Sequence, residues 1–147
     1  MADKNESFSK EERAAMRARA KELKEAAKGE AAEKAVQDAI DASSKSDQVI
    51  ANALRDIVRE HAPSLAAKTY YGMPGWANAD GKIVVFYQPA SKFDTRYGTI
   101  GFDQAAPIDD GPMWATAFGV HEFDEASRKK ITALVKNACK YQPLARE

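Results

Sequence analysis

Residues able to do chemistry gather in two places, the first of which is the run His121-Glu122-Phe123-Asp124-Glu125. It places an imidazole and three carboxylates at the expected junction between a strand and a helix. Nitrogen and oxygen ligands of this kind suit iron or manganese, so the candidate metal ligands are His121, Glu122, Asp124 and Glu125. The alternative is helix-start chemistry, in which Asp124 caps the helix and Glu125 complements its positive end. Because adjacent residues on irregular backbone rarely converge on one ion, the alternative is favoured.

The second place is the stretch from Thr69 to Val120, where aromatic, glycine and proline residues concentrate. Rings and cations there could line a cleft for a small planar or anionic ligand, with Arg96 as a bidentate clamp on a carboxylate or phosphate. The candidate ligand-binding residues are Tyr71, Met73, Trp76, Tyr87, Lys92, Arg96 and Trp114. Alternatively, the aromatic side chains fill the core and the two cations lie at loop edges.

Several catalytic signatures are absent from the sequence. It has no phosphate-binding glycine loop, no nucleophile-elbow serine, no cysteine pair spaced for zinc and no acidic calcium-binding loop. His61 and His121 have no second histidine at i+3 or i+4, so zinc-hydrolase and nucleophilic mechanisms are poorly supported. The single cysteine, Cys139, rules out an internal disulfide bond and is expected to be a core residue.

The composition predicts an ordinary soluble protein with one core. Its 147 residues are enough to bury a core without disulfide bonds. The 22 basic and 22 acidic residues balance, so no overall field favours nucleic acid or an anionic membrane. No apolar run approaches the roughly 20 residues of a membrane span, and no signal-peptide pattern begins the chain. We therefore expect a cytoplasmic protein.

Helical periodicity dominates the first third of the chain. A capping box of Ser9 and Glu12 predicts a helix to about Ala27, and Gly29 is expected to end or bend it. A second helix is expected over residues 30–41. The apolar stripe of the first helix is thin and the charges before Ser46 are interleaved in sign, which is typical of a solvated helical extension. This extension could be mobile, could clamp a sheet or could mediate dimerisation.

A third helix is the first predicted core element. Residues 41–46 are expected to be a linker, with Ser46 as the N-cap of that helix, and Pro63 is expected to stop it. Its apolar stripe repeats at i, i+4, i+7, i+8 and i+11. The stripe comprises Ile50, Leu54, Ile57, Val58 and His61.

After Pro63 the pattern changes from a period of 3.6 to a period of two. Strands are expected at residues 76–78, 82–88, 96–102 and 114–120, with the first two joined by a turn at Asp80-Gly81. In the last strand, the small side chains of Ala115, Ala117 and Gly119 are expected to face a helix. A final helix is predicted from Asp124. Its apolar face comprises Ile131, Leu134, Val135, Ala138 and Cys139.

Part of the chain resembles a known family. The carrying segments are Lys68-Thr69-Tyr70-Tyr71-Gly72-Met73-Pro74-Gly75-Trp76, GKIVVFY at residues 81–87 and GTIGF at residues 98–102. They resemble the bacterial YdhG-like family of domains of unknown function, over roughly residues 46–141. The resemblance implies a compact α+β domain related in fold to frataxin. Members often carry the label iron chaperone, but the resemblance implies no settled activity and no agreed catalytic residues.

Together these features predict an α+β protein with elements in the order α-α-α-β-β-β-β-α. A helical extension over residues 1–45 is expected to precede a YdhG-like domain over residues 46–147, with an antiparallel sheet of four to five strands packed against helices. The expected function is non-catalytic binding, with iron as the candidate metal. Alternatives are a binder of a small anionic or aromatic ligand, and a protein-interaction module acting through the N-terminal helices, with a homodimer as one form. Neither nucleic acid nor a membrane is an expected partner.

Overall fold

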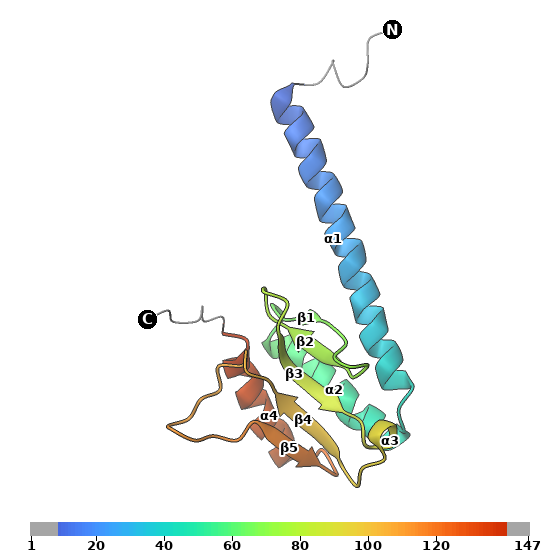
Figure 1. The fold of residues 1–147 in the computed structure, drawn as a ribbon, viewed down its shortest axis with the longest axis vertical. Coiled ribbons are helices and arrows are strands. Elements are labelled where there is room, and N and C mark those ends of the chain that lie inside the picture. Colours follow the sequence, from blue (N-terminus) through green and yellow to red (C-terminus); the bar gives the residue numbers. More distant parts are fainter. Residues whose placement is uncertain (1–8, 141–147) are drawn as a thin grey trace. The chain divides into compact units, whose positions relative to one another are not determined.

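The structure is a computed structural model that describes residues 9–140 (Figure 1). The elements are α1 (Lys10–Asp41), α2 (Lys45–His61), β1 (Ala66–Ala67), β2 (Gly75–Ala77), β3 (Ile83–Gln88), α3 (Ala90–Phe93), β4 (Gly98–Phe102), β5 (Ala117–Val120) and α4 (Glu125–Ala138). The predicted α+β class and antiparallel sheet are confirmed. The chain divides into two compact units between Ala31 and Ala32, inside α1, whereas the sequence placed the boundary after residue 45.

The first helix, α1, runs without interruption through Gly29, so the prediction of two helices is wrong. A glycine inside a helix costs only about 1 kcal/mol relative to alanine, and the alanine, lysine and glutamate residues on both sides are strong helix formers. At the start, the amide of Glu12 donates to the Ser9 hydroxyl over 3.1 Å, as the capping box predicts. Residues 9–31 are exposed, including Met16 and Leu23.

The last part of α1 belongs to the core of the second unit. Val36 and Ile40 are buried with the apolar stripe of α2, and the Arg59 guanidinium lies 3.3 Å from the Glu33 carboxylate. The N-cap of α2 is Ser44 and not Ser46, because the extended backbone of Ser44 lets its hydroxyl accept from the amide of Asp47. The cap therefore lies two residues earlier than the sequence predicted.

The sheet is a meander in the order β1-β2-β3-β4-β5, with every neighbouring pair antiparallel (Figure 1). Trp76 pairs with Val85, whereas Ala77 pairs with Ile83, so β3 bulges at Val84. Both Val84 and Val85 are consequently buried in the core, although they are adjacent in sequence. This explains why β3 has no clean alternation.

The helix-covered face of the sheet is the opposite of the one predicted. Ala117 and Gly119 are exposed, whereas Val120 is buried and Phe118 packs against the core that includes α2 and α4. A Cβ atom at Gly119 would meet the Tyr97 ring. The smooth side of β5 therefore carries an aromatic ring, and α4 lies against the Phe118 side. The apolar face predicted for α4 is confirmed, with Ile131, Val135 and Ala138 buried and Leu134 and Cys139 partly buried against the core.

A buried carboxylate joins α2, β3 and α3. Asp47 is 2% exposed and accepts five hydrogen bonds. The hydroxyls of Tyr87 and Ser91 each donate over 2.6 Å, that of Ser44 over 2.9 Å, and the amides of Ala90 and Ser91 over 3.0 Å. No buried side-chain nitrogen or oxygen lacks a partner in the described residues. The network explains why four residues at 90–93 form a helical turn that the sequence analysis did not predict.

Acid is expected to weaken this network. Burial alone would raise the pKa of Asp47, but the hydrogen bonds from Ser91 and Tyr87 outweigh it and lower the pKa from 3.8 to about 2. The folded pKa lies below the unfolded one, so the stabilisation is complete above pH ~5 and is lost as the pH falls to ~2. The linked loss is about 2 kcal/mol of unfolding free energy. Urea titrations across this pH range should show that loss of unfolding free energy in the wild type and a smaller loss in Asp47→Asn. An equal dependence of the unfolding free energy on pH in the two proteins would contradict the prediction.

Candidate functional site

The seven residues predicted to line an aromatic cleft lie in different environments. Trp76 and Tyr87 are buried in the core, and Met73 is also buried. Tyr87 uses its hydroxyl to bind Asp47, and burial followed by this hydrogen bond raises its pKa, so it stays a proton donor. These three side chains fill the interior, as the alternative interpretation predicted for aromatic residues.

The remaining four cleft candidates are exposed. Tyr71 is 82% exposed, and Trp114 lies in the segment before β5. The Lys92 ammonium donates to the Gly72 carbonyl over 3.0 Å, which ties α3 to the turn that carries Tyr71. Arg96 instead lies over the Tyr97 ring, with 5.0 Å between its guanidinium carbon and the ring centroid.

The turn that presents Tyr71 is strained. The backbone groups of Tyr70 and Met73 exchange two hydrogen bonds of 2.9 Å, and the two residues between them have positive φ, 50° for Tyr71 and 75° for Gly72. This is the geometry of a type I′ turn, in which asparagine or glycine is usual at the position of Tyr71. The ring centroid of Tyr70 lies 4.7 Å from that of Tyr71 and 5.2 Å from that of Phe86.

The candidate metal ligands agree with the alternative interpretation, in which Asp124 caps α4. The Asp124 carboxylate accepts from the amide of Ser127 over 2.8 Å, and hydrogen bonding to Ser127 lowers its pKa. Across residues 9–140, no group of three or more histidine, cysteine, aspartate and glutamate side chains is arranged to hold a metal ion. The set His121, Glu122, Asp124 and Glu125 therefore does not fit an iron site.

Two of these residues instead line a hollow between β5 and α4, with a volume of about 430 Å³. Its lining residues are Phe118, Gly119, Val120, His121, Glu122, Phe123, Ser127, Lys130 and Ile131. The Lys130 ammonium lies 5.1 Å from the centroid of the Phe118 ring, so one wall combines a cation with an aromatic face. A hollow of this size admits a small organic group.

The positions of the lining side chains follow from local structure. Asp124 fixes the first turn of α4 by capping it, and buried Ile131 anchors the next turn to the core. Ser127, Lys130 and Ile131 are spaced i, i+3 and i+4, so they share one face of the helix. His121 and Glu122 were among the predicted site residues. Lys130 and Phe118 were not, because their pairing depends on which face of β5 meets α4.

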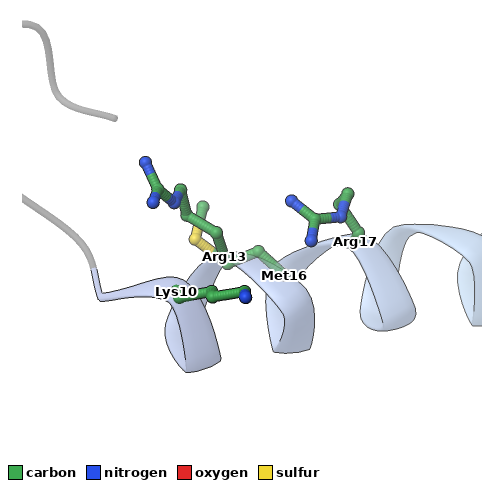
Figure 2. Close-up of a pocket in the computed structure, with 4 residues that line it drawn as sticks. All are labelled: Lys10, Arg13, Met16 and Arg17. Atoms are coloured by element: carbon green, nitrogen blue, oxygen red, sulfur yellow. The ribbon is translucent and has the colours of Figure 1, made fainter. Parts of the chain in front are cut away.

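A second hollow lies at the start of α1, and the described residues that line it all belong to that helix (Figure 2). Lys10, Arg13, Met16 and Arg17 line it, and Arg13 and Arg17 rise from the same side of the helix. Among the described residues no second element forms an opposing wall there. The hollow between β5 and α4 has two walls and is the better candidate site.

Neither a protein-family model, nor a curated protein sequence, nor a solved structure matches the chain. None of the helices within residues 9–140 has the length and apolar character needed to cross a membrane.

Proposed function

We propose that the chain is a non-catalytic cytoplasmic binding protein of the YdhG-like family, and that it holds a ligand with an anionic group and a flat apolar part between β5 and α4. The observation that supports this most directly is the Lys130 ammonium over the Phe118 ring at the wall of the hollow. The ring offers an apolar contact surface, and the ammonium that lies over it offers a charge partner for an anion. The ligand class is the one that the sequence predicts, and the proposed site is the hollow instead of the region around Arg96.

The other lining residues favour a single negative charge on the ligand. The Ser127 hydroxyl and the His121 imidazole can donate hydrogen bonds. The Glu122 carboxylate, also in the lining, would repel a second negative charge nearby. A monocarboxylate on a planar group therefore suits the hollow better than a phosphate ester.

The test is a titration of ¹⁵N-labelled protein with 2-naphthoate, followed by amide chemical shifts. We expect shifts to concentrate at the lining residues of the hollow, with Lys130→Ala weakening binding about five- to tenfold through loss of an ion pair and a ring contact. Lys129→Ala is the matched control, because it removes the same charge from the neighbouring position outside the lining. Equal affinities of the two variants, or shifts only elsewhere, would overturn the proposal.

Iron delivery, which the family label suggests, remains a prediction that the arrangement of His121, Glu122, Asp124 and Glu125 does not favour. Native mass spectrometry after anaerobic addition of ferrous iron tests it independently. A one-to-one adduct that disappears in His121→Ala would support an iron role for this segment. Adducts that follow a statistical distribution in both proteins would count against it.

A further inference from the structure

The hollow borders a free edge of the sheet. β5 is the last strand in the order and pairs only with β4. The amide of Phe102 donates to the Thr116 carbonyl over 2.7 Å, which identifies Phe102 and Thr116 as a hydrogen-bonded pair of the antiparallel ladder. Because hydrogen-bonded pairs alternate, Phe118 and Val120 direct their backbone groups toward β4, whereas Ala117 and Gly119 direct theirs away from the sheet.

This edge lacks the usual protection against strand pairing. Natural edge strands are blunted by charged residues, proline or bulges, and β5 has none of these within Ala117–Val120. In the described residues, the backbone groups of Ala117 and Gly119 make no hydrogen bond outside the ladder. At the other edge, β1 is only two residues long. The free edge of β5 is therefore the better site for an added strand.

Each face of this edge carries a cation on an aromatic ring. On the helix side, Lys130 lies over Phe118. On the opposite side, the Tyr97 ring occupies the space beside Gly119, and Arg96 lies over that ring. Side chains of an added strand would alternate between the two faces, so adjacent residues would meet the two cations. Both cations are complementary to carboxylates.

The charges nearby favour an acidic occupant. From Ala117 to Lys140 the chain has five basic residues, Arg128, Lys129, Lys130, Lys136 and Lys140, against three acidic ones, Glu122, Asp124 and Glu125. One of these acids, Asp124, is already engaged as the cap of α4. β5 of a second copy would bring no carboxylate to this edge, because Ala117–Val120 contains none.

We propose that the hollow also takes a carboxylate side chain of an extended acidic peptide, which pairs with the free edge of β5 as an added strand. One carboxylate side chain enters the hollow beside Lys130, and the next residue directs its carboxylate toward Arg96. Backbone hydrogen bonds to Ala117 and Gly119 supply affinity, and the two cations supply selectivity. This inference rests on the proposed function, because it uses the same hollow.

The experiment titrates full-length ¹⁵N-labelled protein with a blocked peptide of sequence TVEEVTV. We expect protection of the Gly119 and Ala117 amides from hydrogen exchange, and affinity reduced about tenfold for the TVQQVTV peptide. N-methylation of the two central residues should weaken binding at least as much, because it removes strand-pairing donors. Lys130→Ala and Arg96→Ala should each reduce affinity about three- to tenfold, whereas Lys129→Ala should leave it within about twofold.

The outcomes separate this inference from the proposed function. If 2-naphthoate binds in a Lys130-dependent manner but the peptide does not bind, or binds without protecting the Gly119 amide, strand addition is wrong and the small-ligand function stands. If neither probe depends on Lys130, both are wrong. If the Gly119 amide is already protected in a dimer detected by sedimentation, a second copy fills the edge and the peptide inference is overturned.

Discussion

Replacement of Asp47 with alanine is expected to lower the free energy of unfolding by about 3–5 kcal/mol. The carboxylate accepts hydrogen bonds from the N-cap of α2, from β3 and from α3 at once, and its removal leaves the buried Tyr87 hydroxyl without its acceptor. The amides of Ala90 and Ser91 also lose their acceptors. Groups buried without partners cost more than the hydrogen bonds themselves contribute, so the loss exceeds that of an ordinary polar deletion.

Urea denaturation at neutral pH measures this effect. Asp56→Ala is the matched control, because Asp56 lies on the same helix with a side chain that is 62% exposed, and its loss should be within about 1 kcal/mol. If Asp47→Ala does not fold, Asp47→Asn keeps the shape and should lose about 1–3 kcal/mol. A loss for Asp47→Asn no larger than that for Asp56→Ala would show that the network contributes little.

The second large effect is expected at Gly98, on β4. A Cβ atom there would overlap the hydroxyl of Tyr87 and would come within 2.6 Å of its ring carbon Cζ. Tyr87 cannot move aside freely, since it is buried and its hydroxyl binds Asp47. Gly98→Ala should therefore lower the free energy of unfolding by about 2–4 kcal/mol, through overpacking and a weakened hydrogen bond.

Gly29→Ala provides the comparison for this substitution. No atom lies within 4 Å of a Cβ built at Gly29, and the position is inside α1, so alanine should raise local helix stability by about 0.5–1 kcal/mol. Urea denaturation should therefore show a lower free energy of unfolding for Gly98→Ala, whereas circular dichroism should show a more stable helix for Gly29→Ala. If Gly98→Ala is as stable as the wild type, the close packing of Tyr87 against β4 is wrong.

The elements that the sequence predicted correctly are those with a strong local signal. The stripe of α2, the apolar run of β3 and the Asp124 cap each depend on residues close together in the chain. The errors at Gly29 and Ser46 have the same origin, because glycine and serine have modest preferences that neighbouring residues outweigh. β1 and α3 are too short to show a periodic pattern.

The site was harder to predict because its parts meet through tertiary structure. Alternation in β5 separates two faces but does not say which one a helix covers. Gly119 was predicted to lie on the covered face, whereas in the structure Phe118 lies on it. Asp47 has the sequence context of an ordinary acidic residue in the first turn of a helix, and its partners Tyr87 and Ser91 lie 40 and 44 residues away in the chain. Lys130 could be placed beside Phe118 only once that face was known.

The strict sequential order of the sheet has a consequence for the speed and route of folding. Every strand pairs with its neighbour in the chain, so the five strands can assemble by closing one local loop after another. The contact between α2 and α4 is different, because the whole sheet separates them in sequence. The entropic cost of closing the loop between α2 and α4 is reduced once the strands have paired. The meander is therefore expected to act as the early scaffold, with docking of α4, and with it completion of the hollow, as a late step.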